Sequence, residues 1–239
     1  MKLSRNHIKL IAILTMFCDH ATKLFVSQKT LGYTIGRKVI GRIAFPLFGA
    51  LLVEGFFKTK NKELHIFRLL ILALISEPLY DIVLNHGWEK QSIIVTWFLS
   101  YIMLYIFDSI DHSKKIKKFD FAFVLKIMLL LGFCQLAYLI KVDYSYAAIL
   151  ATYIAYEIYR SSKISVYWKP VISIALFGLS EGLIFKSWGA LLAIIPGLLY
   201  SSIKRSKTNT IYRQLLYWSY PIHLCVLWIT CLLLTKNGL

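Results

Sequence analysis

Acidic residues are scarce in this chain of 239 residues: twelve Asp and Glu stand against 28 Lys and Arg, which leaves a formal net charge of +16 at pH 7. In a soluble protein such an excess of positive charge would point to a nucleic-acid partner. Here the cations gather in short connections between apolar runs, as they do in membrane proteins. The charge pattern therefore predicts a membrane topology, and no nucleic-acid partner is expected.

Cysteine is scarce as well, with four residues that all lie inside apolar runs. None of them shows the CxxC or Cys/His spacing of a zinc site, and nothing suggests a disulfide framework, so no metal site is predicted. The chain also lacks a linker, a low-complexity tract and an internal repeat. We therefore expect one integral-membrane domain over residues 1–239.

What the chain has in abundance is apolar sequence: 58% of the residues are hydrophobic, and they fall into long blocks. Because lipid offers the backbone no hydrogen-bond partners, blocks of about twenty residues predict membrane-spanning helices. The expected fold is an all-α bundle with about nine spans, eight or ten being the alternatives. The expected spans are 8–26, 39–57, 64–84, 91–110, 121–140, 144–160, 166–186, 187–202 and 212–234.

The orientation of the bundle follows from the loop charges. Alternate connections hold eighteen Lys and Arg on one side and seven on the other, and the richer side should face the cytoplasm. Residues 1–9 are basic and precede an apolar run, as in a signal peptide, but Asp19 and His20 interrupt that run and no small-residue cleavage site follows. We therefore expect a retained first span, a cytoplasmic amino terminus, and a multi-pass protein of the cytoplasmic membrane.

Several ionisable or polar side chains fall inside the predicted spans or at their outer ends. Each charge placed in a span costs about 2.5–3.5 kcal/mol on insertion scales, so such residues should face the interior and serve a function. With the orientation above, most of them map to the outer half of the bilayer. They are Asp19, His20, Arg42, Glu77, Asp81, Asp143, Tyr144 and Glu181. The sequence thus predicts a polar pocket that opens to the outside.

His20 is the first candidate for a general base, because its ordinary pKa of about 6.5 suits proton transfer near neutral pH. A second histidine, His223, lies in the middle of the last predicted span. Asp19 is not expected to orient its neighbour, since adjacent helical residues point about 100° apart. Glu77, and after it Asp143, is the expected carboxylate partner. The alternatives are a structural hydrogen bond for His20 and an i,i+4 pair with a lysine for Asp19.

Arg42 lies in a segment that Pro46 is expected to kink, and its permanent positive charge needs an anion. That anion could be Glu77, Asp81, or the oxyanion that develops on an acyl carbonyl during transfer. Glu54, near the inner end of the same span, and Tyr220, beside Pro221 in the last span, complete the candidate residues. The alternative for Glu54 is a solvated place at the membrane interface.

Several of these motifs, in this order, resemble TraX-type proteins over nearly the whole chain. They are IKLIAILTMFCDH at 8–20, GRIAFPLF at 41–48, LVEGF at 52–56, ISEP at 75–78, DY at 143–144 and LYWSYPIHL at 216–224. The first two motifs and the last are the most specific. Between about 90 and 210 the likeness rests mainly on apolar pattern.

The resemblance implies an acetyltransferase. The member that gives the family its name acetylates the amino terminus of a conjugative pilin subunit, and the family is similar to membrane acyltransferases that modify sugars outside the cytoplasm. This implies acetyl-CoA as the donor, a catalytic role for His20 or Asp19, and supporting roles for Arg42, Glu77 and His223. The acceptor, a peptide amine or a glycan hydroxyl, is left open, as is the oligomeric state.

Together these observations predict acyl transfer across the membrane, with Asp143, Tyr144, Asp81, Glu54 and Tyr220 as substrate-binding residues. Lys58, Lys60, Lys62 and the run at 114–118 could hold the phosphates of the donor, although topology alone also explains these charges. A proton-coupled transporter is the main competing hypothesis. A non-enzymatic scaffold ranks last, because it leaves the cost of the buried charges unexplained.

Overall fold

The computed structural model describes residues 2–84, 87–113, 119–201 and 209–236, and these residues form helices, with two isolated β-bridges and no strand among them. The α-helices are α1 (Arg5–Phe25), α2 (Leu31–Tyr33), α3 (Ala44–Lys58), α4 (Lys62–Leu84), α5 (Ile93–His112), α6 (Phe119–Leu139), α7 (Ser145–Arg160), α8 (Trp168–Phe185), α9 (Ile194–Leu199) and α10 (Thr210–Lys236). A π-helix, η1 (Thr34–Ile40), and a 3₁₀ turn, η2 (Gly41–Ile43), join α2 to α3. The short 3₁₀ helices η3 (Gly87–Glu89) and η4 (Trp188–Ala193) precede α5 and α9.

These helices confirm the prediction of an all-helical membrane protein. Five helical stretches are long and apolar enough to cross a bilayer: Leu31–Lys58, Ile93–His112, Phe121–Leu139, Trp168–Phe185 and Thr210–Leu234. The first span was expected to begin at residue 8, but α1 begins at Arg5 and carries four charged side chains. A count of nine spans, the cytoplasmic amino terminus and the location in the cytoplasmic membrane remain predictions.

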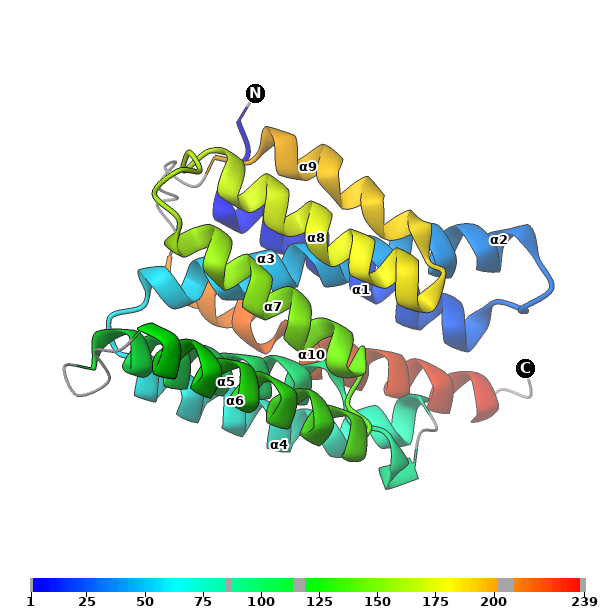
Figure 1. The fold of residues 1–239 in the computed structure, drawn as a ribbon. Helices are drawn as coiled ribbons and strands as arrows, with labels where there is room; N and C mark the ends of the chain where they lie inside the picture. The colour runs from blue at the N-terminus through cyan, green and yellow to red at the C-terminus, as the bar shows by residue number, and fades with distance from the viewer. Residues whose placement is uncertain (1, 85–86, 114–118, 202–208, 237–239) are drawn as a thin grey trace.

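The helices lie side by side in a bundle whose two chain ends are at opposite ends, as Figure 1 shows. The α3–α4 and α7–α8 connections lie at the same end as the amino terminus. Helix α3 is the most interior element and packs against α1, α5, α7 and α8. The ends of α1, α4 and α8 and the starts of α5 and α7 therefore meet at the other end of the bundle.

The interior is packed with aromatic and aliphatic side chains, and Phe56, Tyr101, Phe107 and Tyr156 are fully buried there. Large apolar side chains also cover the outer faces of the helices. Leu183 on α8, for example, is 69% exposed. A soluble protein rarely exposes so much apolar surface, whereas lipid-facing helices require it.

Main-chain contacts fix the loops at the far end of the bundle. Gln91 and Val142 form a parallel bridge, in which the Gln91 amide donates to Lys141 O at 3.2 Å and the Asp143 amide donates to Gln91 O at 3.0 Å. The hydroxyl of Thr96 also donates to Asp143 O at 2.7 Å. These bonds hold the segment before α7 against the start of α5, and so position the residues that line the pocket described next.

Candidate functional site

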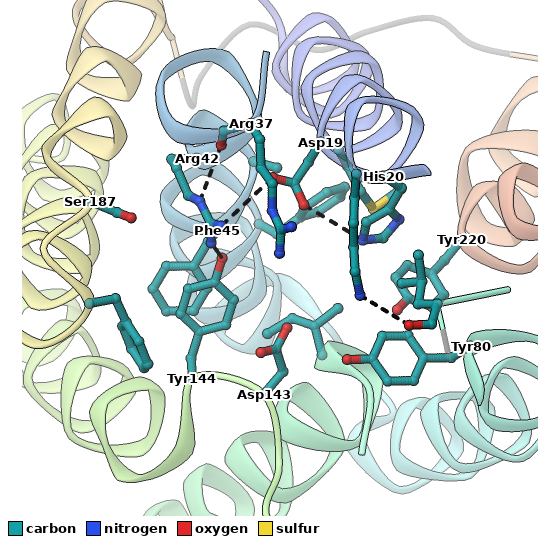
Figure 2. A pocket seen from close by; sticks show the side chains of 18 of the residues that line it. Asp19, His20, Arg37, Arg42, Phe45, Tyr80, Asp143, Tyr144, Ser187 and Tyr220 are labelled. Carbon is teal, nitrogen blue, oxygen red and sulfur yellow. Dashed lines mark hydrogen bonds and ion pairs between the residues drawn. The ribbon is translucent and has the colours of Figure 1, made fainter. Parts of the chain in front are cut away.

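A cavity of about 320 Å³ lies where the ends of α1, α4 and α8 meet the starts of α5 and α7, with η1, the α3 region and α10 completing its wall. Figure 2 shows the polar side chains that point into it. Six of the ten residues predicted as site residues line this cavity. They are Asp19, His20, Arg42, Asp143, Tyr144 and Tyr220.

His20 and His223 form a direct pair across α1 and α10. Nδ1 of His20 lies 2.7 Å from Nε2 of His223, and the rings stack with centroids 5.0 Å apart. Nδ1 of His223 lies 3.1 Å from the carbonyl oxygen of Ser219, which can only accept, so this nitrogen carries the proton. In the neutral pair the other nitrogen of His223 accepts the proton of His20 Nδ1. Nε2 of His20 is thereby left with a lone pair, as a general base requires.

Asp19 lies between this histidine and Arg42. Its Oδ2 is 4.0 Å from His20 Nε2 and its Oδ1 is 3.9 Å from Arg42 Nη2, both too long for hydrogen bonds. The contact with the charged guanidinium of Arg42 is still close enough for electrostatic attraction. Asp19 Oδ1 is buried and has no hydrogen-bond partner among the described residues. The aspartate thus approaches its helical neighbour more closely than the sequence suggested. The ring partner of His20 is nevertheless His223, where Glu77 or Asp143 was expected.

Arg42 is held from several sides. Its Nε donates to the Arg37 carbonyl at 3.2 Å, and its Nη1 lies 3.4 Å from the hydroxyl of Tyr144 and 3.5 Å from Oε1 of Glu181. Glu181 on α8 is fully buried. The anions opposite Arg42 are therefore Asp19 and Glu181, and the predicted pair with Glu77 or Asp81 is not what the structure shows.

Tyr144 closes the wall beside Arg42. Its ring stacks on Phe45 with centroids 3.8 Å apart and an interplanar angle of 5°, while its hydroxyl donates to Glu181 Oε1 at 3.4 Å. The residue has φ of 59°, a left-handed conformation that costs a side-chain-bearing residue of order 1 kcal/mol. The surrounding contacts hold this strained turn, which directs the phenol into the pocket.

Glu77 is engaged elsewhere. Its carboxylate accepts the backbone N–H of Ser92 at 3.1 and 3.3 Å and also the hydroxyl of Ser92, the residue that precedes α5. An anion at this place satisfies a helix N-terminus. Neither Glu77 nor Asp81, further along α4, is among the residues that line the cavity.

Asp143 and Tyr220, predicted as substrate-binding residues, both line the pocket. Asp143 lines the pocket and pairs with Lys90 through a 3.3 Å contact between Oδ1 and Nζ. Tyr220 is buried and packs edge-on against both histidine rings, with centroids 5.1 Å from His223 and 6.3 Å from His20.

Glu54 lies away from this site, about 18 Å along the helical axis from Arg42 if the segment rises ~1.5 Å per residue. Its side chain is 2% exposed, so the solvated alternative does not hold. It accepts hydrogen bonds from Lys58 and from the Tyr200 hydroxyl, each at 2.7 Å, and lies 3.6 Å from Arg5. These contacts join the start of α1, the end of α3 and the segment after α9.

Two residues of the site were given no role in the sequence-based prediction. Glu181 was placed near an outer helix end but given no role, although its position between Gly178 and Gly182 marks a close helix approach. Arg37 was counted among the loop charges, because no apolar run includes it. The structure puts it in η1 and in the wall of the pocket. The predicted phosphate-binding run at 114–118 lies outside the described residues.

Comparison with known proteins places the chain. The family model described as "TraX protein" matches residues 4–231. A probable fimbrial assembly protein, FimC of serogroup H1 from Dichelobacter nodosus, is 38% identical over 78 residues, which is 33% of this chain and 32% of that protein. The match thus spans about a third of the relative's length. No solved structure shows a significant match. The family match covers every residue that lines the pocket, and the chain belongs to the TraX protein family.

Proposed function

We propose that this protein transfers an acetyl group from acetyl-CoA to the amine of an acceptor peptide that reaches the pocket from the outer side of the membrane. The observation that carries the proposal is the His20–His223 pair, which leaves Nε2 of His20 as a base in the same cavity as the Arg42 guanidinium. A base and a fixed cation in one enclosed site are what acyl transfer needs.

The reaction is simple in outline. Nε2 of His20 takes a proton from the attacking amine, whose nitrogen forms a bond to the thioester carbonyl carbon. The electron pair of the carbonyl moves to its oxygen, and Arg42 stabilises that oxyanion, a contribution of about 3–4 kcal/mol for one well-placed donor. When the intermediate collapses, the carbon–sulfur bond breaks and the thiolate of coenzyme A takes the proton from His20.

The donor is proposed to enter from the opposite end of the bundle. Arg5, Lys9 and Arg68 lie close enough to His65 there to interact with it electrostatically, so four basic side chains share one region. Two of the lysines predicted for this task have carboxylate partners instead, since Lys58 pairs with Glu54 and Lys62 pairs with Asp108. Lys9 and Arg68 form no ion pair within the described residues, which leaves their charge available for phosphates.

The distance between the two ends supports this arrangement. Lys9 and His20 are eleven residues apart on α1, which is about 16 Å and within ~20° of the same helix face. The extended pantetheine arm of coenzyme A is long enough to cover such a span. Phosphates held near Lys9 would thus allow the thioester to reach His20.

The acceptor is proposed to be a peptide because of the family and its relative. The family is the TraX family, and the matching protein from Dichelobacter nodosus is named for fimbrial assembly. Fimbriae are built of protein subunits, so a subunit amine is the simplest acceptor. A glycan hydroxyl would need the same base and oxyanion donor, and it is an outcome of the test.

The test is transfer of radiolabelled acetyl from acetyl-CoA by purified protein in detergent, with peptides carrying a free amino terminus and cell-surface glycans as acceptors. We expect labelled peptide with the wild type and a rate at least ~100-fold lower with His20→Ala. His112→Ala is the matched control, because this imidazole is 78% exposed at the other end of the bundle. It should keep the wild-type rate.

Three results would contradict the proposal. Folded wild-type protein that binds no acetyl-CoA would exclude the donor. Binding of acetyl-CoA without transfer to any acceptor would exclude the reaction. Equal rates for the wild type and His20→Ala would show that His20 is not the general base. Label found in glycan alone would support the same chemistry with a glycan, and not a peptide, as the acceptor.

A further inference from the structure

The π-helix η1 gives the pocket a second arginine. In an α-helix, residues five apart point about 140° away from each other. The wider turn of a π-helix closes a hydrogen bond between residues five apart, as Gly41 does here with the carbonyl of Gly36. Arg37 and Arg42 therefore both line the same cavity. Figure 2 shows Arg37 reaching into the pocket between Arg42 and His20.

The lining of the pocket carries more positive than negative charge. Its basic side chains are those of Lys23, Arg37, Arg42 and Lys90, and its carboxylates are those of Asp19 and Asp143. Asp19 faces Arg42, which has Glu181 behind it as well, and Asp143 pairs with Lys90. The excess therefore does not come from Arg42, the cation that the proposed chemistry uses.

Arg37 is the clearest source of this excess. Within the described part of the chain no carboxylate forms an ion pair with it. Its Nη1 instead donates to the hydroxyl of Tyr33 at 2.5 Å, and Tyr33 is buried. This bond holds the guanidinium in place without neutralising it. A partly buried and positioned guanidinium that forms no direct ion pair within the described residues is suited to bind a carboxylate or phosphate, because it offers paired donors in a rigid fork.

We infer that Arg37 binds an anionic group of the acceptor, a carboxylate or phosphate close to the amine that is acetylated. This inference rests on the proposed function and adds a specificity to it: the acceptor peptide carries an acidic residue near its amino terminus. With the anion on Arg37 and the amine at His20, the donor carbonyl lies toward Arg42. The two arginines thus bind different groups, one on each substrate.

The experiment compares matched acceptors with purified protein in detergent. Three tripeptide amides with free amino termini differ only at the second residue, which is aspartate, asparagine or phosphoserine. The measured quantity is kcat/KM for each, with wild type, Arg37→Gln, Arg37→Lys and the control Lys38→Gln. Lys38 is the next residue and exposed, so its substitution removes the same charge outside the pocket.

We expect the wild type to prefer the aspartate or the phosphoserine peptide over the asparagine peptide by about tenfold or more, mainly through KM. In Arg37→Gln this ratio should fall to near one, and in Arg37→Lys it should be intermediate, since the charge remains but the fork is lost. Lys38→Gln should keep the full preference. Which anionic peptide is favoured distinguishes the carboxylate from the phosphate.

Two outcomes would overturn the inference: equal kcat/KM for acidic and neutral peptides in the wild type, or a preference that Arg37→Gln leaves intact. A purely structural role would lower all three rates together and leave the ratio unchanged. If the wild type acetylates none of the peptides, the proposed function fails. Calorimetric binding of the same peptides then still tests whether Arg37 binds the anionic group. Tighter binding of an anionic peptide that is lost in Arg37→Gln supports the inference, and equal or absent binding refutes it.

Discussion

Replacing Glu77 by glutamine separates a structural from a catalytic role for this residue. The carboxylate accepts the backbone N–H and the hydroxyl of Ser92 at the start of α5. A hydrogen bond to a charged group contributes ~1.5–3 kcal/mol, against ~1 for a neutral one, and an anion at a helix N-terminus contributes a further ~0.3–1. Glutamine keeps one acceptor oxygen but loses the charge, so the free energy of unfolding should fall by about 1–2 kcal/mol.

The assay is thermal unfolding of the purified protein together with acetyl transfer per folded molecule. For a chain of this size 1 kcal/mol corresponds to a shift of about 2–4 °C, so the midpoint of Glu77→Gln should fall by roughly 2–8 °C. Transfer by the folded fraction should stay within about threefold of the wild type. Glu89→Gln, at an exposed position, is the control. An unchanged midpoint with lost transfer would refute the structural role and return Glu77 to the catalytic set.

Three further predictions concern other parts of the site. His223→Ala should lower kcat by at least about tenfold, because His20 loses the hydrogen-bond acceptor that fixes its tautomer. His223→Gln should recover part of the rate, since its amide oxygen can accept the same hydrogen bond. Steady-state kinetics measure both variants, and a normal kcat for His223→Ala would contradict a catalytic role for the His20–His223 pair. Glu54→Gln should lower the stability by about 1–3 kcal/mol without changing KM for the acceptor, which thermal unfolding and kinetics check together; a KM effect alone would give this residue a binding role. Gly41→Ala should lower the free energy of unfolding by about 1–3 kcal/mol and reduce transfer, because the new Cβ would lie 2.9 Å from the Cα of Asp19 on α1. In Gly32→Ala the nearest contact would be 3.7 Å away, so this variant should lose little stability. Similar unfolding midpoints for these two glycine variants would contradict the close approach.

The sequence was sufficient to predict an all-helical membrane protein and several residues of the pocket, but not the number of spans. Apolar blocks of span length identify membrane helices with little dependence on tertiary contacts, because lipid forces each segment to satisfy its own backbone. The ionisable residues inside those blocks, Asp19, His20 and Arg42, were conspicuous for the same reason, and the structure brings them together.

The pairings could not be read from the sequence, because they depend on which helices are neighbours. His20 and His223 are 203 residues apart, and nothing local indicates that α1 and α10 touch. Glu77 was predicted to be a catalytic carboxylate. Nothing in its own segment of the sequence indicates that it caps the start of α5 instead. Arg37 was missed because it lies before the apolar run predicted to begin at residue 39 and so was counted as a loop charge, whereas the structure places it in η1.

The proposed function requires that one pocket joins a donor from the basic end of the bundle to an acceptor from the other end. Protein reconstituted into vesicles with known orientation tests it most directly, with labelled acetyl-CoA enclosed on the side of Arg68 and acceptor peptide added on the side of Asp143. We expect labelled peptide outside intact vesicles, at a rate at least ~100-fold lower when His20 is replaced by alanine. Transfer that requires donor and acceptor on the same side would contradict it.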